Sequence, residues 1–169
     1  MEKLNTYEKY PVWIIVLSNC VSIVIYLLGF LIILEIGFVF ALFYLFYILF
    51  LEYRLIKNHC TDCYYFGKAC GFGRGLLSSL FFKKGDISKF CSMEMTWKDL
   101  LPDMLVSLIP LITGIVLLII KFNFVLLIEL VILVLLTTIG NSIIRGKFTC
   151  KFCKQREIGC PAEKLFDRK

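Results

Sequence analysis

Histidine is nearly absent from this sequence: His59 is the only one among 169 residues. There is also no Gly-x-Ser-x-Gly segment, so the chain lacks both a Ser-His-Asp candidate set and the nucleophile elbow of α/β-hydrolases. No strand signal precedes the glycine run at Gly71, Gly73 and Gly75, which removes the context of a Rossmann phosphate-binding loop. These absences exclude a recognisable hydrolase site and leave the glycine run as a flexible turn.

Charge is missing from long stretches of the chain, which is 59% hydrophobic. Residues 12–34, 36–51 and 104–120 carry no charged side chain, and residues 122–144 carry only Glu129. A bilayer core of about 30 Å requires about 20 apolar residues of helix. The first stretch is too long for the apolar region of a signal peptide, so we expect it to remain in the protein. We expect four transmembrane helices, at about residues 12–34, 36–57, 103–120 and 122–144.

Very short connections separate the stretches of each pair, with Glu35 in the first and Lys121 in the second. One continuous helix across either pair would be longer than a bilayer can cover, so each pair must form a tight hairpin. The predicted fold is therefore an all-α membrane protein with four transmembrane helices in two tandem hairpins and with cysteine-rich cytoplasmic loops.

A cysteine motif, Cys-x2-Cys-x6-Cys, follows each hairpin. Its members are Cys60, Cys63 and Cys70 in the first copy, and Cys150, Cys153 and Cys160 in the second. Because each hairpin has an even number of helices, both units enter the membrane in the same orientation, which predicts a parallel internal repeat with both motifs on one face. We divide the chain into a first repeat at 1–75 with its motif at 60–70, an interfacial linker at 76–101 that contains Cys91, and a second repeat at 102–169 with its motif at 150–160.

Positive charge is almost absent from the predicted hairpin tips, because only Lys121 of the 19 Lys and Arg residues lies there. The positive-inside rule therefore places both termini, the middle loop and both cysteine motifs in the cytoplasm of a multi-pass membrane protein. The net charge of +6 is explained by this topology and by attraction to anionic lipid. We expect the lipid bilayer as a partner, and no nucleic acid.

Seven of the eight cysteines lie in polar loops, whereas Cys20 lies inside the first helix, where we expect a packing role. Cytoplasmic thiols stay reduced, so disulfides are disfavoured there, and the loop thiols are suitable metal ligands. The loop cysteines and the histidine supply eight candidate ligands, the number that two tetrahedral sites need. These candidates are His59, Cys60, Cys63, Cys70, Cys91, Cys150, Cys153 and Cys160. Zinc is the favoured metal, and an iron–sulfur cluster is the alternative.

Two ligand arrangements fit the spacing. In one, a site forms from Cys60, Cys63, Cys70 and Cys91, and another from Cys150, Cys153, Cys160 and His59. In the other, the pairs Cys60/Cys63 and Cys150/Cys153 form one site like that of a zinc ribbon, which joins the two halves. Nearby basic residues favour thiolate over thiol; they are Lys68, Arg74, Lys147, Lys151, Lys154 and Arg156.

Three functions are compatible with the cysteine motifs, and the sequence indicates no catalytic residue. The first is a structural zinc module that recruits a protein partner at the cytoplasmic face or stabilises a homodimer. The second is a membrane redox protein with an iron–sulfur cluster. The third is a four-helix thiol–disulfide oxidoreductase that uses Cys60/Cys63 or Cys150/Cys153.

Polar side chains inside the predicted spans give one further candidate site. Glu129 lies six residues after Asn123, about 9 Å below the far surface at about 1.5 Å per residue. An intramembrane carboxylate is costly and therefore a candidate for proton relay or cation binding; it could also be neutral and bonded to Ser18 or Asn19. The stripe of Ser18, Ser22 and Tyr26 is assigned to hydrogen bonding between helices.

Overall fold

The computed structural model describes residues 6–94 and 96–162. In this part of the chain four helices are long and apolar enough to cross a membrane, as in a multi-pass membrane protein. They are built on α1 (Val12–Leu34), α2 (Phe38–Leu55), α5 (Trp97–Ile120) and α6 (Phe124–Leu135). The prediction of an all-helical chain with four such helices is confirmed.

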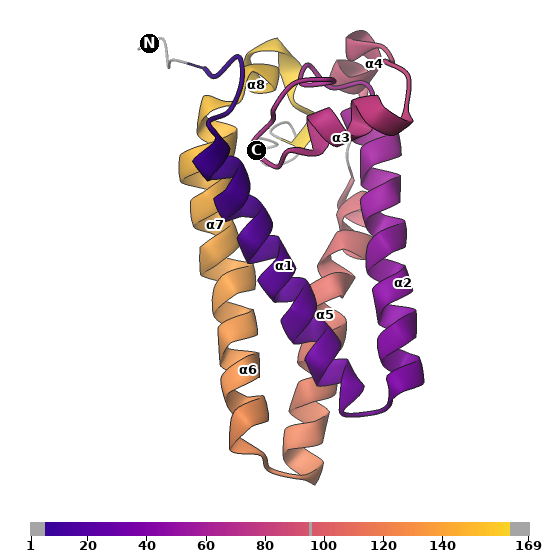
Figure 1. The fold of residues 1–169 in the computed structure, drawn as a ribbon, viewed down its shortest axis with the longest axis vertical. Helices are drawn as coiled ribbons and strands as arrows, with labels where there is room; N and C mark the ends of the chain where they lie inside the picture. Colours follow the sequence, from indigo (N-terminus) through magenta and orange to yellow (C-terminus); the bar gives the residue numbers. More distant parts are fainter. Residues whose placement is uncertain (1–5, 95, 163–169) are drawn as a thin grey trace.

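Figure 1 shows that the turns between α1 and α2 and between α5 and α6 lie at one end of the bundle. The helix α1 packs against α2, α5 and α6, and α5 also packs against α6, so α1 and α5 form the central pair. The N-terminal arm, the middle loop and α8 (Lys154–Gly159) lie at the opposite end. We call this the cysteine end.

The outer surface of the bundle is apolar. Phe43 on α2 is 69% exposed and Ile119 on α5 is 80% exposed, and many large apolar side chains on the four long helices are similarly accessible. A soluble monomer rarely exposes so much contiguous apolar area, whereas helices in lipid require it.

Helical turns of unusual geometry connect the bundle to both cysteine motifs. After α2 the chain forms the π-helical turn η1 (Ile56–Cys60), which ends on the first cysteine of the first motif. After α6 it passes through η2 (Leu136–Gly140), α7 (Asn141–Ile143), η3 (Ile144–Thr149) and the 3₁₀ turn η4 (Cys150–Phe152). The π-helical turn η3 therefore ends immediately before the second motif. Such turns are rare and frequently occur at functional sites.

A buried contact between three helices fixes the middle of the bundle. Pro110 inside α5 lacks an N–H, which leaves the carbonyl of Val106 without its usual helical partner. The Tyr44 hydroxyl of α2 donates to that carbonyl at 2.7 Å, which satisfies it away from water. Gly29 of α1 gives Tyr44 the space to do so, because a Cβ there would lie 2.2 Å from the Tyr44 hydroxyl oxygen.

The middle loop contains two short helices, α3 (Arg74–Phe81) and α4 (Ile87–Ser92). In α3, Leu80 and Phe81 are exposed, whereas Ser78 is buried. After this loop, α5 begins six residues before the span predicted at 103. Its start is set by a capping box between Thr96 and Asp99.

Candidate metal centre

The N-terminal arm, residues 6–10, lies across both cysteine motifs. The backbone N–H of Tyr7 donates to Phe152 O at 3.0 Å, and the N–H of Tyr10 donates to Ala69 O at 2.9 Å. Each acceptor directly precedes a motif cysteine. The arm therefore joins the end of the first motif to the middle of the second.

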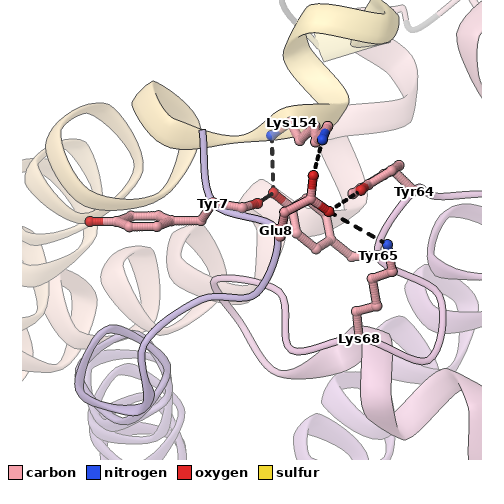
Figure 2. Close-up of polar contacts among 6 residues, drawn as sticks. All are labelled: Tyr7, Glu8, Tyr64, Tyr65, Lys68 and Lys154. Carbon is pink, nitrogen blue, oxygen red and sulfur yellow. Dashed lines mark hydrogen bonds and ion pairs between the residues drawn. The ribbon is translucent and has the colours of Figure 1, made fainter. Parts of the chain in front are cut away.

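Glu8 adds an ionic link between the motifs (Figure 2). Its carboxylate accepts a hydrogen bond from the Tyr64 hydroxyl at 2.5 Å and pairs with the ammonium groups of Lys68 and Lys154. Tyr64 and Lys68 belong to the first motif, and Lys154 follows the second cysteine of the second motif. Both motifs thus share one carboxylate.

Tyr65 lies at the centre of the same junction. Its hydroxyl donates to Tyr7 O at 2.6 Å and accepts from the Lys154 N–H at 3.0 Å, as Figure 2 shows. Its ring is 2% exposed and packs with Tyr10 and Ile14 in a buried cluster. The side chains of Cys63, Cys70 and Cys153 lie against this cluster, so aromatic rings shield the thiols from water.

The structure brings thiols of the two motifs within electrostatic range of one another. Cys63 interacts with Cys153 and Cys160 of the other motif as well as with Cys70 of its own. Cys60 interacts with Cys70 and Cys63. No disulfide forms among the eight cysteines. In the part of the chain that the structure describes, no three His, Cys, Asp or Glu side chains are close enough to hold one metal ion.

Gln155, which sequence reasoning missed, connects three parts of the site: the first motif, the linker and the second motif. The side chain is 2% exposed; its Oε1 accepts from the Tyr64 N–H at 2.7 Å. Its Nε2 donates to Gly159 O at 3.0 Å and to the Cys91 sulfur at 3.5 Å. A glutamine inside a polar motif carries no sequence signal for such a role, because its partners lie 64 and 91 residues away.

Burial dominates the titration of the two thiols at the junction. It raises the pKa of Cys63 to about 12, with the thiols of Cys153 and Cys70 adding to the rise. It likewise raises the pKa of Cys153 to about 11, against hydrogen bonds from the backbone of Gln155 and Arg156 that lower it. Both thiols are therefore protonated at neutral pH and weakly nucleophilic.

The expectation that basic neighbours favour thiolate is not met at Cys63 and Cys153, because burial raises the pKa of both thiols. Metal binding to these thiols must therefore displace protons.

The remaining predicted ligands lie in different surroundings. Gly75 N–H donates to the Cys70 sulfur at 3.3 Å, and Cys150 is exposed. His59 stacks edge-on against Phe90 at a centroid distance of 6.3 Å, within electrostatic range of Asp103.

Cys20, which was not a predicted ligand and for which we expected a packing role, is exposed on α1.

A partly buried ion pair, also missed from the sequence, anchors the first motif to the bundle. The Arg74 guanidinium donates to both oxygens of Glu52, at 2.8 and 2.5 Å. The Tyr26 hydroxyl donates to the same carboxylate at 2.6 Å. Glu52 lies near the end of α2 and Arg74 begins α3, so the pair connects a membrane helix to the loop that follows Cys70.

The remaining polar side chains of α1 bond mainly within their own helix. Ser18 and Ser22 donate to carbonyls of their own helix, Ile14 O and Ser18 O, rather than to another helix. The amide of Asn19 donates to Ile15 O and Phe72 O. Glu129 is half-buried on α6 and within electrostatic range of Glu35 in the turn after α1, so the structure places it far from the cysteine end.

No protein-family model matches this sequence, and no curated protein and no solved structure matches the chain.

Proposed function

We propose that this chain is a multi-pass membrane protein whose two cysteine motifs form a single metal–thiolate module on the cytoplasmic side, with zinc as the favoured metal. The observation that carries the proposal is the junction itself: Cys63 lies near Cys153 and Cys160 of the other motif. Six motif thiols gathered at one end of a membrane bundle are suited to a thiophilic metal.

The surroundings of the thiols support a structural role for the metal. In its described residues the loop between α2 and α5 has no helix longer than α3, and large apolar side chains of that helix, Leu77, Leu80 and Phe81, are exposed instead of packed in a core. A bound zinc ion contributes folding free energy directly to such a segment. We propose that the loaded module presents a fixed surface for a protein partner or for a second copy of the chain.

Two observations support the parallel repeat and the cytoplasmic placement. A π-helical turn leads into each cysteine motif, η1 before the first and η3 before the second. Among the described residues, every Lys and Arg except Lys121 lies in the segments 9, 54–98 or 145–156. These segments lie toward the cysteine end and not at the hairpin turns (Figure 1), as the positive-inside rule requires for a cytoplasmic face.

An iron–sulfur cluster is the second candidate, and a specific observation favours it. Cys63 interacts electrostatically with thiols of the other motif, yet no three donors among the described residues are within reach of one ion. A cluster of several iron atoms separates its thiolate ligands more widely than one zinc ion does. Buried Pro161, directly after Cys160, matches the Cys-Pro that ends many ferredoxin motifs.

Anaerobic purification of the full chain in detergent, followed by elemental analysis and a visible spectrum, tests the proposal. We expect colourless protein with stoichiometric zinc. A broad visible band with iron and sulfide would replace zinc by an iron–sulfur cluster. Protein with neither metal, under conditions that preserve its fold by circular dichroism, would contradict the proposal. Cys20→Ser is the matched control, because Cys20 lies on α1 outside both motifs, and it should leave the metal content unchanged.

A further inference from the structure

We propose that the exposed apolar face of α3 docks into the surface of the bilayer, and that three flanking lysines select a leaflet with anionic lipid headgroups. The inference does not depend on a metal. It goes beyond the interfacial linker expected at 76–101, because it assigns the contact to one face of one helix and names the class of lipid.

The helix α3 has its polar side against the protein and its apolar side outward. Ser78 is fully buried and its hydroxyl donates to Gly75 O at 2.8 Å, whereas Leu80 is 76% exposed and Phe81 is 73% exposed. The other exposed apolar side chains of this helix are Leu76 and Leu77. A helix in a loop surrounded by water has the opposite arrangement. The outward apolar side matches the membrane helices of this chain, so we infer that it also contacts lipid.

Close packing against the first cysteine motif fixes this orientation. A Cβ at Gly75 would lie 2.2 Å from Tyr65 O and 2.5 Å from Lys68 O, so the helix can approach the motif this closely only because glycine has no side chain. The carbonyl of Gly75 also accepts from the Gly67 N–H at 2.9 Å. Rotation of the apolar side inward would break these contacts, so that side stays outward.

Both ends of α3 lie beside the last turn of α2, which contains the charged residues of that helix. Arg74 at the start of α3 pairs with Glu52, and Phe82, directly after α3, packs against the Tyr53 ring at a centroid distance of 5.8 Å. Consecutive residues rise about 1.5 Å along a helix axis, whereas the eight residues of α3 are about 12 Å long. The helix therefore lies across the end of α2 (Figure 1), as an interfacial helix does.

Three lysines flank the apolar face. Lys83 and Lys84 follow α3 and are exposed, and the ammonium of Lys57 lies 5.7 Å from the centroid of the Tyr53 ring. The ion pairs among the described residues involve other cations, and the nearby Asp86 carboxylate caps α4. Cations without a carboxylate partner beside an apolar face complement anionic headgroups. The bilayer around the four long helices brings such headgroups to this level without any further partner.

Hydrogen exchange of the full chain in lipid nanodiscs, with one chain in each disc, tests the docking. We would compare discs of phosphatidylcholine with discs that also contain phosphatidylglycerol. The amides of residues 76–84 should exchange more slowly in the anionic discs, since docking opposes local opening. Equal exchange in the two kinds of disc would overturn the selection of anionic lipid. Protection that appears only with two chains in a disc would mean that a second copy covers this face, which would also overturn the proposal.

The double variant Lys83→Gln with Lys84→Gln tests the charges. Because each lysine near an anionic surface adds attraction, the protection gained from phosphatidylglycerol should fall about 10-fold or more. The matched control, Lys147→Gln with Lys151→Gln, removes the same charge from exposed positions of the second repeat and should keep that protection. An equal loss in both variants would indicate a general effect of net charge and would overturn the assignment to α3.

Quenching by lipids brominated on their acyl chains tests the apolar contact. Leu80→Trp places a fluorophore on the proposed face, and Ile158→Trp places one at an exposed apolar position of α8. The wild type, with Trp13 and Trp97, gives the background. We expect additional quenching in Leu80→Trp and none in Ile158→Trp.

Equal quenching of the two tryptophan variants would overturn the proposal. Unquenched Leu80→Trp with the circular dichroism spectrum of the wild type would overturn it as well. These measurements require no metal, so either failure would leave the proposed metal–thiolate function standing.

Discussion

The two cysteine motifs have the same spacing but different supports. The first is anchored to a membrane helix by a partly buried ion pair between Arg74 and Glu52. The second follows α6 through helical turns and is held by the N-terminal arm, through the hydrogen bond from Tyr7 to Phe152 O and the ion pair between Glu8 and Lys154. The comparison indicates that the positions of the thiols matter more than the surrounding side chains, which differ between the copies.

Substitutions in the two supports should also differ in how much they destabilise the protein. The support of the first motif is partly buried between α2 and α3, where an unpaired charge is costly. The support of the second is an exposed network, where ion pairs contribute little. Substitutions in the two supports should therefore lower the free energy of unfolding by different amounts. A shared metal site should nevertheless make their effects on metal content alike.

Removing Arg74 should have the largest effect on stability. Arg74→Ala leaves Glu52 without its partner in a partly buried site, and we expect a loss of roughly 3 kcal/mol in the free energy of unfolding. Replacing both residues, Arg74→Met with Glu52→Gln, should recover most of that loss. The measurement is denaturant unfolding in detergent, with Lys83→Ala as the control because Lys83 is an exposed cation of the same loop. Equal losses in Arg74→Ala and Lys83→Ala would show that the ion pair does not support the first motif.

Each motif contains one glycine with positive φ, and these glycines should respond differently. Gly159→Ala adds backbone strain and brings its Cβ into contact with Cys91, 3.4 Å from Cys91 Cβ, so we expect a loss of about 2 kcal/mol in the free energy of unfolding and reduced metal content. Gly67→Ala adds the strain alone, because its Cβ would meet only Ser79 at an ordinary 3.8 Å. Thermal unfolding and elemental analysis would separate the two, with Gly146→Ala, which meets nothing within 4 Å, as the neutral control. A smaller loss of metal in Gly159→Ala than in Gly67→Ala would contradict the placement of Cys91.

Glu8→Gln should have a small effect that is shared by both motifs. Its carboxylate is exposed, so we expect less than about 1 kcal/mol, diminishing further at high salt. Hydrogen exchange should become faster around both Tyr64 and Lys154, which Glu8 contacts. Faster exchange confined to one of the two would show that the arm does not join the motifs.

Glu129→Gln should have the smallest effect at the cysteine end. Glu129 lies on α6 near the opposite end of the bundle, so metal content should be unchanged and the free energy of unfolding should change by less than about 0.5 kcal/mol. A loss of metal in this variant would reveal a connection along the bundle that the contacts do not show.

The four long helices could be predicted from the sequence because uncharged stretches report them directly; the first was placed at residues 12–34, the bounds of α1. The start of α5 depends instead on a capping box at Thr96, seven residues before the span predicted at 103. The roles of Gln155 and Arg74 could not be predicted, because they depend on contacts between loop residues that are far apart in sequence. The hydrophobic pattern of the sequence does not indicate such contacts. The direction of the pKa shift at Cys63 was missed for a related reason: the sequence shows nearby cations but not the burial that outweighs them.

The metal content of Cys63→Ser, Cys153→Ser and the double variant tests most directly whether the two motifs form one module. Both residues lie at the junction between the copies. If they hold the same metal, each single substitution should remove the same number of equivalents, and the double substitution should remove no more than either alone. Losses that add in the double variant would mean that each motif binds its own metal, which would contradict a single shared module.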